Sequence, residues 1–328
     1  MVPITRKVVV EVPHRISGFF EIVDEIEGTK IANPEKIGSR GAGFNLSAVG
    51  RTKILVENLD KMDNDKINIF INDERMDEKA ETTYFIYDYL KNYFKRSIKI
   101  SIFHKFDLPV GCGYGASGSG ALGTIYGLNL AFNLNLNDIE KGRIAHIAEV
   151  VNRTGLGTVC GQLRGGLCIL REPGFPCNSE SIRIPKNLKI ICGSFGMIHT
   201  KSILTDPVLN KKIKEAGKKA QKMLLKNKNI KSFIQASIEF VKDTNMLKIL
   251  NLYEIEELLH SLNNLEILGA SMNQLGRSIY AICRNEGEEL KVMEVLSSYK
   301  PEINIFITSI SKRGPYFLSS KEVKHFHS

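Results

Sequence analysis

A glycine-rich stretch about one third of the way along the chain limits most strongly what this sequence can fold into. The stretch from Pro109 to Gly123 contains six glycines and two serines, and an apolar helical pattern that ends near Phe132 follows it directly. Glycines let backbone N–H groups converge on an anion, and the N-terminus of the following helix adds a partial positive charge. The stretch therefore predicts a phosphate-binding loop at the start of a helix.

Three kinds of phosphate-binding loop compete to explain this stretch. A Walker A loop needs a lysine followed by serine or threonine after its last glycine, and no such pair stands here. A dinucleotide-binding loop fits Gly113, Gly115 and Gly118 literally, but Asp138, about 20 residues on, is expected to open a helix instead of closing a strand. A proline followed by glycines, small residues and serine at a helix start fits both the loop and its context. A glycine turn without a ligand is the remaining alternative.

Strand and helix patterns alternate irregularly along the chain, which is typical of an α+β fold. Strands are expected at 8–12, 19–23, 53–56, 67–71, 98–103, 167–170, 188–192, 279–283 and 303–308, helices at 81–94, 138–152, 230–241 and 255–262, and further glycine-rich loops at 38–43 and 269–276. Residues 14–18 are expected to connect two strands. Turn residues cluster at 172–176 and the pattern restarts after Pro185. We therefore expect an N-terminal domain of residues 1–180, with the phosphate loop at 109–123, and a C-terminal domain of residues 181–328.

The composition excludes several classes of protein. Hydrophobic residues make up 43% of the chain, but no apolar run approaches the roughly 18 to 20 residues that cross a bilayer. The first 15 residues alternate apolar and polar side chains like a strand, and they lack the apolar core of a signal peptide. We therefore expect a cytoplasmic location without membrane contact.

The six cysteines form no C-x-x-C pair, and no histidine stands near them at zinc-finger spacing. They are Cys112, Cys160, Cys168, Cys177, Cys192 and Cys283. This pattern predicts buried thiols, with neither a disulfide framework nor a metal site.

The net charge of +9 is concentrated in one segment. Between Lys211 and Lys231 the chain has nine lysines and one acid, Glu215. Surfaces that bind nucleic acids usually interleave lysines with arginines and aromatic residues, and this segment has neither. The segment therefore predicts a helix with a solvated basic face, and no nucleic-acid partner is expected.

Several segments, taken in order, resemble the archaeal pantoate kinases of the GHMP kinase superfamily. They are PHRISGFF at 13–20, GSRGAG at 38–43, the phosphate loop, AHIAEV at 145–150, TGLG at 154–157, residues 196–204 and GASMNQLG at 269–276. The resemblance covers most of the chain and implies the two-domain GHMP kinase fold. It also implies phosphorylation of pantoate to 4-phosphopantoate with ATP and Mg²⁺, a step of coenzyme A biosynthesis, and by family analogy a homodimer.

The resemblance implies which residues bind the nucleotide and the metal ion. The nucleotide-binding set is Pro109, Gly111, Gly113, Gly115, Ala116, Ser117, Gly118, Ser119 and Gly120. On the helix at 138–152, apolar residues form one stripe, while His146, Glu149 and Arg153 share another face. The resemblance gives the metal and phosphate roles to Ser117 and Glu149 and places His146 in the acceptor pocket.

Pantoate carries a carboxylate, and an arginine matches a carboxylate with two parallel hydrogen bonds. Arg171, Arg164 and Arg40 are the candidates, and Arg171 is preferred because the family places an arginine just before a Pro-Gly turn. By the same resemblance, Ser39 binds the acceptor and Thr200 lines its pocket. We expect Ser39, Arg40, His146, Arg171 and Thr200 to form the acceptor site.

One residue departs from the family pattern. Pantoate kinases tend to have an aspartate after the TGLG segment, where this chain has Thr158, which cannot act as a carboxylate base. Positioning and charge neutralisation supply most of the rate of phosphoryl transfer, so activity does not require this base. His146 is the nearest titratable substitute, and the general base stays unassigned.

Two alternative functions remain open from the sequence. The first is a GHMP kinase for another small alcohol, such as mevalonate, homoserine or shikimate, because only the acceptor residues argue against it. The second is a non-catalytic protein that binds nucleotides or nucleic acids, which Thr158 and the lysine segment would favour.

Overall fold

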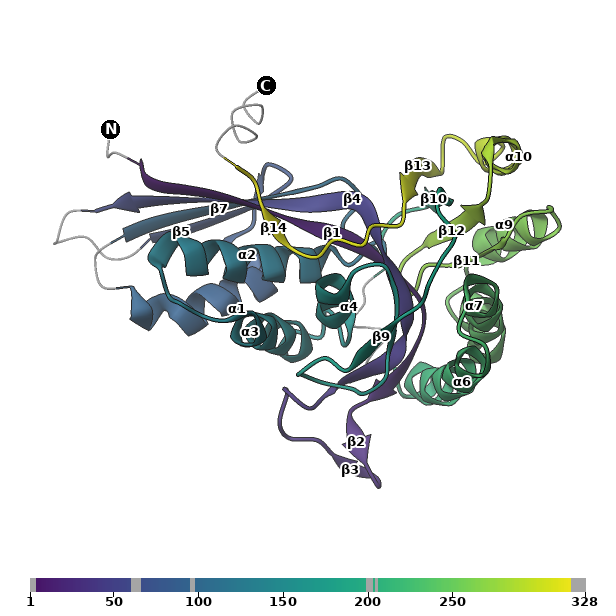
Figure 1. Ribbon diagram of the computed structural model, residues 1–328, viewed down its shortest axis with the longest axis horizontal. Coiled ribbons are helices and arrows are strands. Elements are labelled where there is room, and N and C mark those ends of the chain that lie inside the picture. The colour runs from purple at the N-terminus through teal and green to yellow at the C-terminus, as the bar shows by residue number, and fades with distance from the viewer. Residues whose placement is uncertain (1–3, 60–65, 95–97, 199–202, 204–205, 320–328) are drawn as a thin grey trace.

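The computed structural model describes residues 4–59, 66–94, 98–198, 203 and 206–319. This part of the chain contains two large β-sheets covered by helices and one small two-stranded sheet (Figure 1). The first sheet contains β1 (Ile4–Val23), β4 (Gly38–Asn58), β5 (Lys66–Ile71), β6 (Glu74–Arg75), β7 (Ile98–Phe106), β8 (Leu167–Leu170), β9 (Ser179–Ser181) and β14 (Tyr316–Phe317). The second contains β10 (Lys189–Ser194), β11 (Gly269–Met272), β12 (Ser278–Cys283) and β13 (Asn304–Ser309), and β2 (Glu25–Ile26) pairs with β3 (Thr29–Lys30). The helices are α1 (Glu81–Leu90), α2 (Ala116–Phe132), α3 (Asp138–Val151), α4 (Thr158–Arg164), α6 (Pro207–Lys226), α7 (Ile230–Thr244), α8 (Met246–Ile249), α9 (Tyr253–Asn263) and α10 (Glu286–Ser297).

The strand orders define the two sheets. The first sheet has the order β14-β1-β4-β7-β5-β6, with β8 paired to β4 and β9 paired to β8, and the second has the order β11-β12-β10-β13. Most pairs are antiparallel, but β5 and β7 are parallel. This arrangement of helices on two sheets confirms the predicted α+β class.

Two hydrophobic cores share the long strands β1 and β4. The part of these strands that includes Val10 and Ile54 packs under α1, α2 and α3. The other part packs against α6, α7 and the second sheet, where Phe20 lies 5.8 Å from Phe240 and Phe44 lies 5.8 Å from Phe233, measured between ring centroids. Figure 1 shows the first helices and α6 with α7 on different sides of the bent strands.

The length of β1 and β4 corrects two expectations from the sequence. Residues 14–18 were expected to be a connection but lie inside β1, and residues 38–43 were expected to be a loop but form the start of β4. A Cβ atom on Gly41 would lie 2.4 Å from the Phe19 carbonyl oxygen, and one on Gly43 would lie 2.2 Å from that of Ile16. The glycines therefore allow close contact between neighbouring strands instead of forming a turn.

Most of the other expected elements are confirmed, and three of the described helices were missed: α4, α10 and the four-residue α8. The segment 269–276 begins as β11 and only its end is a turn. Helix α4 has seven residues, too few for a helical period to be recognised. Helix α10 buries only Glu288, Val292 and Leu296, so its apolar stripe is weak.

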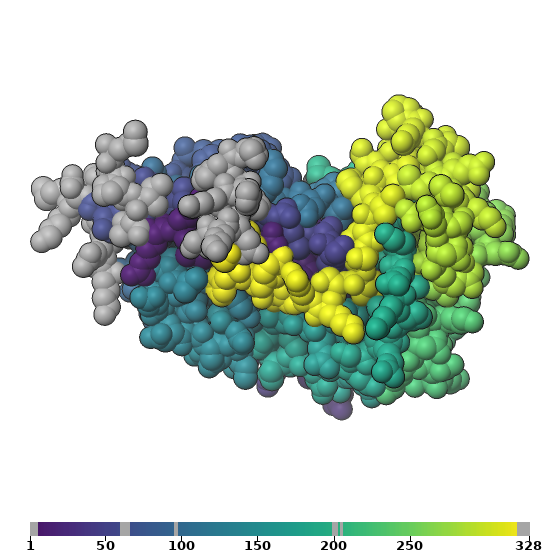
Figure 2. Space-filling model, turned by 45° about the horizontal axis from the view of Figure 1, so that its top comes forward, coloured from purple at the N-terminus to yellow at the C-terminus, as the bar shows by residue number. Residues whose placement is uncertain are grey.

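The C-terminal segment returns from the second sheet to the first. After β13, the backbone N–H of Gly166 donates to the Ser311 carbonyl at 2.7 Å, and that of Ser311 donates to the Asn45 carbonyl at 2.8 Å. Strand β14 then pairs with β1. Figure 2 shows this yellow segment lying across the purple and blue strands of the N-terminal part. The predicted division of the chain near residue 180 stays a prediction.

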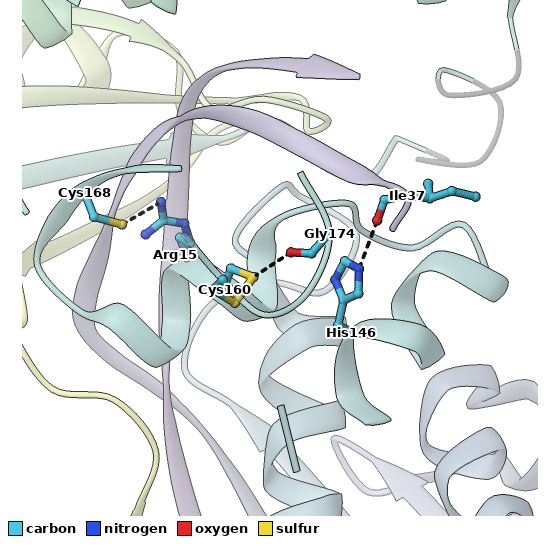
Figure 3. The surroundings of a disulfide bond; sticks show 7 residues. Arg15, Ile37, His146, Cys160, Cys168 and Gly174 are labelled. Atoms are coloured by element: carbon cyan, nitrogen blue, oxygen red, sulfur yellow. Dashed lines mark hydrogen bonds between the residues drawn. A yellow bond between two sulfur atoms is a disulfide. The ribbon is translucent and has the colours of Figure 1, made fainter. Parts of the chain in front are cut away.

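The cysteines correct another expectation, because Cys160 of α4 forms a disulfide bond with Cys177 (Figure 3). The segment 172–178 folds back onto α4, and a separation of 17 residues in the sequence gave no sign of this contact. The other four cysteines are buried thiols, as expected, at Cys112, Cys168, Cys192 and Cys283.

The lysine-rich segment forms α6 and the start of α7. Leu209, Ile213 and Leu224 face the core, which confirms the expected amphipathic helix. Lys214 forms ion pairs at 2.8 Å with both Asp24 and Glu25, next to the β2–β3 hairpin. Within the described residues, no helix is long and apolar enough to span a membrane.

Candidate active site

The phosphate loop lies between β7 and α2, as the sequence predicts. Gly111, Gly113 and Gly115 have φ angles of 75°, 84° and 67°, in the left-handed region that favours glycine. Gly115 is the N-cap of α2, and the first residues of this helix are Ala116 and Ser117. The loop thus directs the N-terminus of a long helix toward the space in front of it, where unpaired N–H groups favour an anion.

A cavity of ≈ 510 Å³ opens in front of this helix N-terminus. Its wall combines the phosphate loop with residues 153–158, parts of β1 and β4, and the turn at Gln274 and Leu275 beyond β11. The volume lies within the ordinary range for small-ligand sites. Segments from distant parts of the chain therefore meet at one site of suitable size.

Glu149 of α3 is a buried carboxylate behind this wall, only 1% exposed. The Thr154 hydroxyl donates a 2.7 Å hydrogen bond to its Oε1 atom, whereas its Oε2 atom is buried without a hydrogen-bond partner among the described residues. Burial raises the pKa of the Glu149 carboxyl, and the nearby hydroxyls of Thr154 and Ser117 act in the opposite direction. A capping box of Asn137 and Glu140 fixes the start of α3.

The unpartnered Oε2 atom of Glu149 fits a magnesium site. Mg²⁺ is commonly held by one or two carboxylates together with substrate phosphates and water. Among the described residues, no group of three or more His, Cys, Asp or Glu side chains could hold a metal ion by itself. Glu149 and the Ser117 hydroxyl therefore suit an ion that arrives with a nucleotide, since the phosphates would complete its coordination.

Only part of the predicted nucleotide-binding set lines the cavity. Gly111, Gly113, Gly115, Ala116 and Ser117 do so, and Pro109, Gly118, Ser119 and Gly120 do not. The Ser119 hydroxyl instead donates to the carbonyl oxygens of Val12 and Pro13 at 3.0 and 3.2 Å. Ser119 therefore anchors the loop to β1, and Ser117 is the serine that faces the site.

Of the predicted acceptor residues, Ser39 lines the cavity. Arg40 does not line it and pairs with Glu21 at 3.1 Å, and Arg171 pairs with Glu180 at 3.4 Å, also away from the cavity. Arg164, the third candidate, donates to the Ser181 hydroxyl at 3.0 Å. Thr200 lies outside the described residues.

His146 lies behind the cavity wall. His146 is 1% exposed, and its Nε2 atom lies 2.9 Å from the Ile37 carbonyl oxygen (Figure 3). The centroids of the His146 and Phe175 rings are 6.1 Å apart. Burial lowers the pKa of His146. The structure does not bring His146 to the cavity, and its geometry suits support for the start of β4 better than general base catalysis.

Thr158 lines the cavity as the first residue of α4. Its Cγ2 atom is so close to the loop that a Cβ atom on Gly115 would lie 2.8 Å away, and one on Gly118 would lie 2.9 Å away. The position where the family tends to carry an aspartate is thus beside the phosphate loop. In this chain it offers a hydroxyl and a methyl group.

Three cationic residues of the cavity wall were not assigned from the sequence. Arg15 of β1 is 2% exposed and donates to Asn45 Oδ1 at 3.3 Å and Cys168 Sγ at 3.5 Å. Arg153 and Lys79 are exposed on the wall. Arg15 belongs to the PHRISGFF segment, and Arg153 was expected to share a helical face with Glu149. The structure corrects the second expectation, because α3 ends at Val151 and Arg153 follows its C-cap.

Comparisons with known proteins agree with this geometry. The family model "GHMP kinases N terminal domain" matches residues 81–166, which include the phosphate loop and Glu149. A pantoate kinase of Methanocaldococcus jannaschii is 34% identical over 84% of this chain and 92% of that protein, and one of Thermococcus kodakarensis is 31% identical over 87% and 90%. A solved structure described as a phosphotransferase related to the CoA biosynthesis pathway has a TM-score of 0.83 at 27% identity, over 95% of this chain and 99% of that chain.

Proposed function

The chain belongs to the pantoate kinase family of GHMP kinases, and on that premise we propose that it transfers the γ-phosphoryl group of ATP to a hydroxyl of pantoate, which yields ADP and 4-phosphopantoate. The observation that carries this proposal is the phosphate loop at the N-terminus of α2 with Glu149 behind it, on a cavity of ≈ 510 Å³. This arrangement offers an anion site and a metal-binding carboxylate together, which is what transfer from a nucleotide requires.

The residues around the phosphate loop have complementary roles in this proposal. The left-handed glycines and the start of α2 direct N–H groups at the nucleotide phosphates. Glu149 and Ser117 would hold Mg²⁺, which would neutralise the charge of the nucleotide phosphates. Thr154 keeps the Glu149 carboxylate in position through its 2.7 Å hydrogen bond.

Among the residues predicted to bind the acceptor, Ser39 lines the cavity. Its hydroxyl lies so close to residue 157 that a Cβ atom on Gly157 would be 2.3 Å from its Oγ atom. The acceptor would thus lie between β4 and the segment 154–158, next to the phosphate loop. Since Thr158 supplies no carboxylate, we propose that positioning and charge neutralisation provide most of the rate.

A test of acceptors separates this proposal from its alternatives. ADP release would be measured with pantoate, mevalonate, homoserine and shikimate, and the phosphorylated product identified by ³¹P NMR. We expect turnover with pantoate and its loss in the Ser117→Ala variant. Turnover with mevalonate alone would overturn pantoate as the acceptor, and ADP release that stayed at background with every acceptor would overturn the kinase function.

The oligomeric state needs a separate experiment. Gel filtration with light scattering would test the homodimer expected from family analogy.

A further inference from the structure

Arg153 has a backbone conformation that is unfavourable for an arginine. It follows the C-cap Asn152 at the end of α3 and has a φ angle of 55°. This position after a helix is usually occupied by glycine, because a Cβ atom is strained in the left-handed region. Strained backbone that persists in a structure is often found at functional sites. A function of the side chain would explain why arginine stands here.

The side chain of Arg153 is available to a ligand. Arg153 lines the cavity and is exposed, and within the described part of the chain no ion pair or hydrogen bond of its guanidinium is found. The next residue is Thr154, whose hydroxyl holds the Glu149 carboxylate at 2.7 Å. Arg153 therefore stands immediately beside the proposed metal site.

The other arginines near the site are already occupied. Arg40 and Arg171 have carboxylate partners in Glu21 and Glu180. Arg15 is 2% exposed and is held between Asn45 and Cys168. Of these four arginines, Arg153 is the one that combines a place on the cavity wall with free donors. A planar guanidinium with free donors is suited to two parallel hydrogen bonds with a carboxylate or phosphate.

We propose that Arg153 binds an anionic oxygen of a reactant in this cavity, either the carboxylate of the acceptor or a phosphate oxygen of the nucleotide. The inference deepens the proposed function and rests on it. Both sources offer the same chemistry, since each presents delocalised negative charge to the guanidinium. The contact positions the reactant beside Glu149 and offsets the strain of the backbone.

The chain offers variants that separate binding from folding. Arg153→Gly removes the guanidinium and relieves the left-handed strain, so its melting temperature should equal or exceed that of the unchanged protein. Arg153→Lys keeps the charge but loses the fork-shaped donor set. Glu27→Gly is the matched control, because Glu27 is a charged, exposed residue with a φ angle of 48° that does not line the cavity.

Steady-state kinetics and calorimetry would test the proposal with pantoate and with a non-hydrolysable ATP analogue plus Mg²⁺. We expect Arg153→Gly to lower kcat/KM by about 10- to 100-fold, the range of a lost hydrogen bond to a charged group. Arg153→Lys should recover part of the loss, and Glu27→Gly should change nothing. A rise in KM or Kd for pantoate alone would identify the acceptor carboxylate, and a rise for the nucleotide alone would identify the phosphates.

The inference would be overturned if Arg153→Gly had kinetic and binding constants within twofold of those of the unchanged protein for both reactants. Failure of the proposed function gives a different result. The unchanged protein would then not phosphorylate pantoate, while the calorimetric comparison of nucleotide binding would still decide whether Arg153 holds an anion.

Discussion

At the scale of single residues, Glu149 is proposed to bind the metal ion, but its buried carboxylate is costly in the free protein. A buried carboxylate without a partner on Oε2 is unfavourable in its charged form, and burial raises its pKa. A bound cation would remove this disadvantage. The structure is thus better adapted to the loaded state than to the free one.

We expect the Glu149→Gln variant to be more stable than the unchanged protein at neutral pH but to lose at least about 100-fold in kcat. A carboxyl with a raised folded-state pKa stabilises the fold fully below its unfolded pKa, and this contribution is lost as the pH rises through the folded pKa. The stability difference between variant and unchanged protein should therefore grow from pH 4 to pH 8. Melting temperatures without Mg²⁺ over this range would check it, and a difference independent of pH would contradict it.

Gly155 lies where a side chain would disturb Glu149. A Cβ atom there would be 2.1 Å from Glu149 Oε2, so Gly155→Ala must displace the carboxylate. We expect kcat to fall by about 10- to 100-fold, since displacements near 1 Å have effects of this size. Gly287→Ala in α10 is the control, because its nearest neighbour lies at 3.4 Å. Equal kinetics for both variants would show that this geometry does not matter.

More of the residues predicted to bind the nucleotide line the cavity than of those predicted to bind the acceptor. The positions of Ser117 and Glu149 could be predicted because a glycine loop and a helical face restrict where they lie, and their roles stay predictions. Arg40 and Arg171 could not be placed, because their ion pairs form with residues 19 and 9 positions away whose positions depend on the tertiary fold. His146 is buried outside the cavity lining, which the sequence did not show because a helical face does not reveal which neighbour covers it.

At the scale of secondary structure elements, glycines misled the prediction most. In 38–43 they permit close strand pairing in β4, whereas in 109–115 they form left-handed turns. The local sequence does not distinguish these two uses, because they differ only in whether a neighbouring strand lies close to the glycines in the folded chain. Helix α4 illustrates another limit, since it is held by packing and by a disulfide rather than by its own periodicity.

We expect reduction of the Cys160–Cys177 bond to destabilise the protein by about 3 kcal/mol, the value for a closed loop of about this length. Urea unfolding with and without a reductant would measure it. Replacing both cysteines with serine should give a protein with the lower stability that no longer responds to the reductant. If the unchanged protein unfolded identically in both conditions, the bond would contribute nothing.

At the scale of the whole molecule, β1 and β4 join the two cores. Phe20 and Phe44 on these strands pack against Phe240 and Phe233 of α7, although they belong to the N-terminal half of the sequence. Strand β14, near the C-terminus, pairs with β1 in the first sheet. The apolar side chains of the first sheet are thus buried partly by the C-terminal half of the chain. The turn residues near 172–185, from which the domain boundary was predicted, could not reveal this packing.

We therefore expect residues 1–180 alone not to form a stable fold, although the sequence suggested a domain of that length. Removing residues 181–328 would expose the buried Phe19, Phe20 and Phe44, and each large apolar side chain loses about 1.5 to 3 kcal/mol on exposure. The full chain should instead unfold in one transition, with coincident near- and far-ultraviolet circular dichroism. The fragment should bind a hydrophobic dye and lack near-ultraviolet signal. Cooperative unfolding of the isolated fragment would show that α1–α4 and the first sheet without β14 are sufficient by themselves.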